Sequence, residues 1–185
     1  MKKKLPISLI LLVILVISLV FNVMNLVRNH QSYKQSTQML SSHLYSSLQS
    51  SVRNLDDFLA DSTNNKKQLE GAGIDLIKVD TIVFENSSYY KNPLYYPGIL
   101  SFSYIADNLI HFNQSILNGT PLTDKELTYV KTLHDDLNSL VSEMSDMMKN
   151  NAIKGLSMEQ LNYVIGKFYD KWSNPDTNPY RLVIN

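Results

Sequence analysis

The first sixty residues of the chain carry two different hydrophobic patterns. From Leu5 to Val27 apolar residues fill almost every position, which is typical of a helix that is buried on all sides. Further along, apolar residues recur mainly at steps of four and three, which predicts an amphipathic helix with one buried stripe. The stripe consists of Tyr33, Leu40, Leu44, Leu48, Val52, Leu55 and Leu59. No Gly or Pro separates the two patterns, so we expect one continuous helix.

The apolar run is long enough to be a membrane anchor. Its 23 residues span about 34 Å as a helix, which matches the hydrocarbon core of a bilayer. Lysines occupy positions 2–4 before the run, whereas Arg28 and Lys34 follow it. This excess predicts a cytoplasmic N-terminus. We therefore expect residues 1–4 to form a cytoplasmic stub, residues 5–27 to cross the lipid bilayer, and the rest to lie outside the cytoplasm.

A cleaved signal peptide is the alternative for this segment. Such a peptide has a shorter apolar region, of roughly 7–15 residues, followed by small residues at the cleavage site. Here the run ends in Phe21-Asn22-Val23-Met24-Asn25, without an Ala or Gly pair. The pattern favours a retained anchor.

Helical patterns continue through residues 28–175. Residues 99–117, 123–150 and 157–172 repeat apolar positions at helical spacing. The segment 66–86 is ambiguous, because its β-branched residues allow a strand and two glycines weaken a helix by about 1 kcal/mol each. We favour a helix there, ending near Asn86. The sequence predicts an all-α chain, in which the transmembrane helix precedes an antiparallel bundle of four or five helices. A tail, residues 176–185, ends in a short strand-like run.

Three helix boundaries have clear local signals. Thr123 and Glu126 match a capping box, in which each side chain satisfies a free backbone N–H of the other residue. Ser157 and Gln160 repeat the pattern at the next helix. The sequence Asn118-Gly119-Thr120-Pro121 is typical of a helix stop.

The charge distribution and the lack of cysteine exclude several classes of function. Four of the 17 basic residues flank the apolar run, so residues 29–185 carry 13 basic and 17 acidic side chains. An acidic domain is a poor partner for nucleic acid. The absence of cysteine excludes disulfides, thiolate metal sites and cysteine nucleophiles.

We find no pattern that indicates catalysis or a cofactor. The histidines, His30, His43, His111 and His134, do not pair at metal-ligand spacing, and we interpret them as surface or boundary residues. Nucleophile and phosphate-loop motifs are also missing from the sequence. Asp56-Asp57 and Asp135-Asp136 are adjacent carboxylates, which diverge by about 100° on a helix. We interpret both pairs as solvated faces. The sequence therefore predicts no catalytic, cofactor-binding or metal-binding residues.

Two features could contact a partner. Tyr89, Tyr90, Tyr95 and Tyr96 lie in a loop with two prolines, and tyrosines suit recognition of proteins or glycans. The same tyrosines could instead pack against one end of the bundle. Serine pairs at 41–42, 46–47 and 50–51 could permit close approach of a second helix, and so a homodimer, or could simply form the polar face.

These features favour a non-catalytic binding or regulatory module in the bacterial envelope. The layout resembles the extracytoplasmic helical sensor modules of bacterial chemoreceptors and sensor kinases, although their second membrane helix and cytoplasmic output domain are missing from this sequence. We expect a single-pass protein of the cell membrane that acts through a membrane or envelope protein partner. The alternative is a small-ligand sensor that signals through a partner's membrane helix. An envelope hydrolase would need converging carboxylates or histidines, for which the sequence gives no indication.

Overall fold

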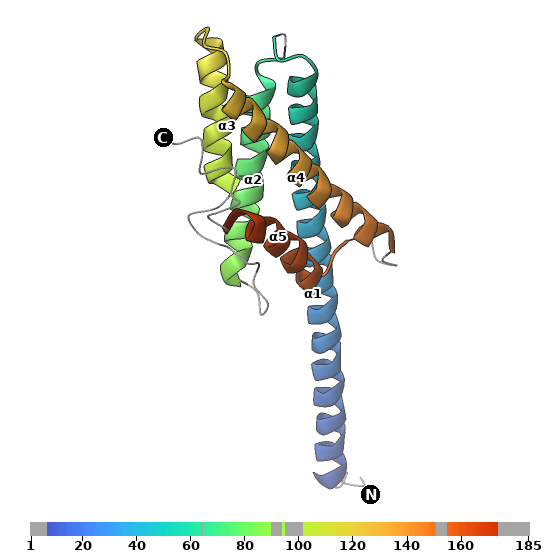
Figure 1. Cartoon of the computed structure of the whole chain (residues 1–185). Helices are drawn as coiled ribbons and strands as arrows, with labels where there is room; N and C mark the ends of the chain where they lie inside the picture. Colours follow the sequence, from blue (N-terminus) through green and yellow to red (C-terminus); the bar gives the residue numbers. More distant parts are fainter. Residues whose placement is uncertain (1–6, 64, 90–93, 95–101, 151–154, 174–185) are drawn as a thin grey trace, which may run out of the picture. The chain divides into compact units, whose positions relative to one another are not determined.

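A computed structural model shows an all-α protein (Figure 1). It describes residues 7–63, 65–89, 94, 102–150 and 155–173, without the side chains of 7–10, 13, 87–89, 172 and 173. These residues form five helices and no strand. The helices are α1 (Ile7–Ala60), α2 (Gln68–Tyr89), α3 (Phe102–Leu117), α4 (Asp124–Asn150) and α5 (Met158–Ser173).

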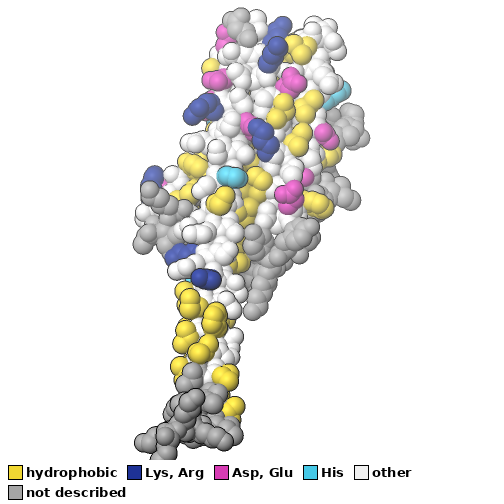
Figure 2. Space-filling model, turned by 180° about the vertical axis from the view of Figure 1, so that it is seen from behind, with side chains coloured by type: hydrophobic (Ala, Val, Ile, Leu, Met, Phe, Trp, Pro, Cys, Tyr) yellow, Lys and Arg dark blue, Asp and Glu magenta, His cyan; other side chains and the backbone are white. Residues whose placement is uncertain are grey.

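The chain divides into two units, residues 1–37 and 38–185. The first unit contains the N-terminal part of α1, where the described large apolar side chains between Leu11 and Val27 are 46–69% exposed. Figure 2 shows in yellow the part of this apolar surface that faces the viewer. Among the residues whose side chains are described, no helix combines the length and the hydropathy that a membrane span requires. Residues 5 and 6 of the predicted span lie outside the described residues.

The second unit is a helical bundle with a continuous apolar core. Within it, α1, α2 and α3 alternate in direction, and α4 runs obliquely to them (Figure 1). The stripe predicted on α1 faces this core: Leu44, Leu48 and Leu55 are fully buried. Leu133 and Leu137 of α4 are buried in the same core. The pattern therefore predicted the buried face of α1 correctly from Leu40 to Leu55, whereas the assignment of Tyr33 to this face was wrong, because its side chain is 39% exposed.

The ambiguous segment 66–86 is helical, and its second glycine explains how it packs. A Cβ atom on Gly73 would lie 2.9 Å from Cγ1 of Ile110 and 3.1 Å from the carbonyl oxygen of Ala106. Glycine therefore permits α2 to approach α3 closely, and this packing outweighs its low helix propensity. The helix continues to Tyr89, so the end predicted near Asn86 was wrong. Asn86 stays within the helix, where its side chain donates to the carbonyl oxygen of Ile82 over 2.7 Å.

All three predicted boundary signals are confirmed. The backbone N–H of Thr123 donates to Oε2 of Glu126 over 2.7 Å, and that of Glu126 donates back to Oγ1 of Thr123 over 3.3 Å. Ser157 and Gln160 make the equivalent reciprocal pair. At the end of α3, Gly119 adopts a φ of 88°, and the N–H groups of residues 119 and 120 bond back to the carbonyls of residues 116 and 115. This pattern is a Schellman motif, which satisfies carbonyls that the helix end leaves free.

Two of the serines of α1 are buried in contacts within the chain. Ser51 donates to the carbonyl oxygen of Ala72 in α2 over 3.3 Å. Ser41 accepts a hydrogen bond of 3.1 Å from the backbone N–H of Leu156. By contrast, Ser42, Ser46 and Ser50 are exposed, as a polar helix face requires. Ser51 therefore lies where α1 approaches α2, whereas Ser41 contacts the segment that precedes α5.

Candidate functional site

The predicted tyrosine site falls largely outside the described residues. Tyr89 is the last residue of α2, but its side chain is not described. Tyr90, Tyr95 and Tyr96 also lie outside the described residues. Partner binding by these four tyrosines therefore stays a prediction.

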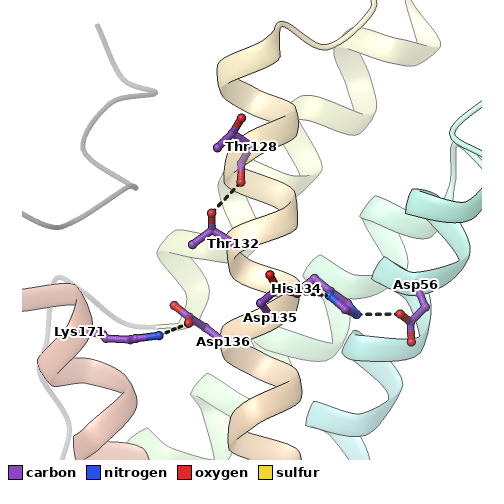
Figure 3. A network of polar contacts seen from close by, with 7 residues as sticks. All are labelled: Asp56, Thr128, Thr132, His134, Asp135, Asp136 and Lys171. Carbon is purple, nitrogen blue, oxygen red and sulfur yellow. Dashed lines mark hydrogen bonds and ion pairs between the residues drawn. The ribbon is translucent and has the colours of Figure 1, made fainter.

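A histidine links α1 to α4 within the bundle (Figure 3). Nε2 of His134 lies 2.7 Å from Oδ1 of Asp56, and Nδ1 lies 3.0 Å from Oδ1 of Asp135. A neutral imidazole has a single N–H, so only the protonated ring can donate to both carboxylates. The ring of His134 therefore lies between two acidic residues, with one nitrogen facing each carboxylate.

The position of His134 follows from the helical pattern of α4. It comes directly after the buried Leu133 and is itself 17% exposed at the side chain, so it lies at the boundary of the core. The sequence predicted this boundary position, but not its partner, because Asp56 is 78 residues away in the chain. Only the packing of α1 against α4 brings the two side chains together.

Charged pairs also join α4 to α5. Lys171 donates to Oδ1 of Asp136, and Lys167 donates to Oε2 of Glu143 over 2.9 Å. The side chain of Asp136 is only 9% exposed, so its assignment to a solvated face was wrong. The two aspartates at 135 and 136 do diverge, as neighbours on a helix must: one contacts His134 and the other contacts α5 (Figure 3). The sequence signal that could have identified Asp136 is its place one residue before the buried Leu137.

A shallow groove lies between these two ion pairs. It encloses about 170 Å³, its floor is apolar, and its rim is charged. The hydrogen bond from Lys167 to Glu143, together with the negative charge there, raises the pKa of Lys167, which therefore stays protonated at neutral pH. The lining consists of Asp136, Ser139, Leu140, Glu143, Val164, Lys167, Phe168 and Lys171. Such a groove could hold a small ligand with an apolar body and a polar end.

Helix α2 carries two buried carboxylates that the sequence did not single out. Asp75 accepts hydrogen bonds from Asn54 (3.1 Å) and Lys78 (2.6 Å). Asp80 is 8% exposed and accepts a hydrogen bond of 2.9 Å from Ser103 in the first turn of α3. Its other oxygen, Oδ1, has no hydrogen-bond partner among the described residues. These acidic groups bind α2 to α1 and to α3, which is a structural role.

The described side chains do not assemble into a metal site. Across the described ranges, no three His, Cys, Asp or Glu residues come together in a metal-binding arrangement. Tyr129 is 1% exposed, and burial raises its pKa although a hydrogen bond of 3.2 Å from Asn108 acts in the opposite direction. A buried phenol with a raised pKa is neutral at physiological pH, and the ring of Tyr129 packs edge-on against Phe112.

Comparison with known proteins gives no relative for this chain. No protein-family model, no curated protein and no solved structure matches it.

Proposed function

We propose that the chain is a membrane-anchored helical module that binds or regulates other proteins of the bacterial envelope. The observation that carries the proposal is the exposure of Leu11 to Val27 on every side of α1. Apolar surface of this extent is unfavourable in water, at about 25 cal/mol for each Å². The described part of the first unit, residues 7–37, belongs to α1 alone and offers no second element to cover it, whereas a lipid bilayer would cover all of it.

The orientation follows from the charges on either side of the apolar segment. Lysines 2–4 keep the N-terminus in the cytoplasm, so residues 38–185 lie on the outer side. Fractionation tests insertion: the full chain should stay in the membrane pellet through alkaline carbonate extraction. A variant with Leu15→Lys and Leu19→Lys should be released, while Ser32→Lys and Ser36→Lys, which add the same charge beyond the segment, should not. Release of the unaltered chain would refute the anchor.

Cysteine labelling tests the topology, because the chain has no cysteine of its own. Ser62 is exposed in the turn between α1 and α2, so Ser62→Cys offers a single thiol on the bundle. A maleimide that cannot cross membranes should label it in intact cells. Labelling only after cell lysis would place the bundle in the cytoplasm and reject the proposed orientation.

Binding of a protein partner is proposed for the tyrosine segment. The described polar groups support a non-catalytic role, because His134, Asp136 and Glu143 form ion pairs that join helices. A chain carrying Tyr→Phe at positions 89, 90, 95 and 96 would keep the aromatic area, while Tyr→Ala would remove it. We expect co-purified membrane proteins to be lost with alanine and retained with phenylalanine. Retention in both variants would exclude this segment as the binding surface.

The alternative, a small-ligand sensor, is supported by the groove between α4 and α5. Ser139 lies on its rim and is exposed, so Ser139→Phe would fill the groove without disturbing the core. A ligand screen by thermal unfolding should then give shifts with the original chain that disappear in this variant. If no compound shifts the unfolding temperature, or if the shifts persist in Ser139→Phe, the groove is not a ligand site.

A further inference from the structure

The polar residues of the apolar segment of α1 lie on one face of the helix. Between Leu11 and Val27 the polar positions are Ser18, Asn22 and Asn25. Their steps of four and three continue through Asn29, Ser32 and Ser36, all within the helical range of α1 and within residues 1–37. At about 100° per residue, these six positions fall in a sector of about 80°. We call them the polar stripe.

The amides of this stripe are poorly suited to contact with lipid. The side chains of Asn22 and Asn25 are exposed, and neither makes a hydrogen bond with another described residue. An amide has two donors and a carbonyl acceptor, and hydrocarbon can satisfy none of them. Large apolar side chains, such as Leu19, Val20 and Phe21, surround the stripe on the same helix. In a bilayer, a helix with this pattern is stabilised most by a second helix that covers its polar side.

We propose that the polar stripe is the interface of a parallel dimer formed by two copies of this chain. The proposal rests on the membrane insertion proposed above, because it is the lipid that leaves the amides without partners. In a parallel pair each asparagine faces its own counterpart, and one amide can donate to the oxygen of the other. The steps of four and three repeat every seven residues, which is the spacing of a left-handed pair of helices, in which polar residues at the seam fix the register.

The uncharged character of the stripe favours a second copy over a charged partner. All six of its residues are Ser or Asn, so two identical stripes meet without repulsion between like charges. Arg28 and Lys34 lie on other faces of the helix, about 80° and 160° from Ser18. Two chains inserted with the same topology are also parallel by necessity, which matches the register that the paired asparagines require.

Disulfide cross-linking in membranes tests the interface directly, because the chain contains no cysteine. Single variants Ser18→Cys and Asn25→Cys place thiols on the stripe, while Val20→Cys and Val27→Cys place them about 180° away. After mild oxidation of membranes holding the full chain, we expect the stripe variants to give at least fivefold more dimer. Equal yields on both faces, no dimer at all, or a cross-linked product with a different protein would overturn the dimer.

A second pair of variants distinguishes the dimer from the anchor. Asn22→Leu with Asn25→Leu removes the amides but makes the segment more apolar, so the chain should remain in the carbonate-resistant pellet. Its dimer dissociation constant, measured by energy transfer between labelled chains in vesicles, should rise about tenfold. The control variant Val20→Leu with Val27→Leu should leave that constant unchanged. An unchanged constant in the asparagine variant rejects the dimer alone, while release from the membrane rejects the proposed anchor.

Discussion

Helix α1 contains the same residue types in two opposite environments. In its N-terminal part Leu15 and Leu19 are 65% and 63% exposed, whereas further along Leu44 and Leu48 are fully buried. Both stretches are helical, so backbone conformation does not distinguish them. The distinction lies in the pattern: apolar residues surround the first part and follow a single stripe in the second.

This difference indicates where each part finds its apolar contacts. A single stripe needs a core on one side only, and α2 to α5 provide that core within residues 38–185. A helix that is apolar all round needs contacts on every side, and the described residues of the first unit, 7–37, contain no other element to make them. The fold therefore explains the single apolar stripe of the second part. The lipid that we propose around the first part explains why apolar residues cover all its sides.

The test with the largest expected effect on stability truncates one leucine in each part of α1. Leu48→Ala should lower the free energy of unfolding of the bundle by about 2–5 kcal/mol, because Leu48 is fully buried and alanine leaves a cavity. Leu15→Ala should leave it unchanged, because Leu15 makes no core contact in the second unit. Urea unfolding of the full chain in detergent, followed by circular dichroism, measures both. Equal losses would show that the two parts unfold as one core.

A glycine pair tests how tightly the bundle is packed. Gly73→Ala should destabilise the bundle by about 1–3 kcal/mol, because the new Cβ would lie 2.9 Å from Ile110 and 3.1 Å from the carbonyl of Ala106. Gly166→Ala is the matched control, since no described atom beyond the adjacent residues and backbone of α5 lies within 4 Å of its Cβ position. There the gain in helix propensity should stabilise the bundle by about 0.5–1 kcal/mol. Thermal unfolding of both variants checks the opposite signs, and two changes of the same sign would contradict the close approach.

Local patterns were sufficient to predict the helix boundaries that have a capping box or a glycine stop. The capping boxes at Thr123 and Ser157 depend on residues three positions apart, so the sequence contains the whole interaction. The stop at Gly119 is local for the same reason. The segment 66–86 was harder to predict, because the role of Gly73 depends on Ile110, a residue of another helix.

The polar contacts between helices could not be predicted, because their partners are distant in the sequence. The pair of His134 with Asp56 spans 78 positions, and the bond from Leu156 to Ser41 spans 115. Such pairs depend on how the helices cross, and the apolar pattern does not specify the crossing. The assignment of Asp136 to solvent failed for this reason, since α5 covers it. The tyrosine site remains a prediction, because most of it lies outside the described residues.

The ion pairs of α4 allow a smaller test. Asp136→Asn should cost about 1 kcal/mol, because the carboxylate is 9% exposed and pairs with Lys171, whose own exposure of 66% limits the gain. Asp146→Asn breaks an ion pair in which both side chains are 72% exposed. It should change stability by no more than about 0.5 kcal/mol. Chemical unfolding of the two variants separates them. A loss at Asp146 as large as that at Asp136 would show that burial does not decide the strength of these pairs.

The smallest expected effect concerns the histidine link between α1 and α4. A double-mutant cycle with His134→Gln and Asp56→Asn should give a coupling of about 0.5 kcal/mol, because the carboxylate of Asp56 is 60% exposed.

A second cycle with His134→Gln and Asp135→Asn is the matched comparison, because Asp135 contacts the same ring from within α4. Its carboxylate is 79% exposed, so we expect a coupling no larger than that between His134 and Asp56. Chemical unfolding of the single and double variants measures both couplings. A coupling to Asp135 that exceeds the coupling to Asp56 would contradict the role of His134 as a link between α1 and α4.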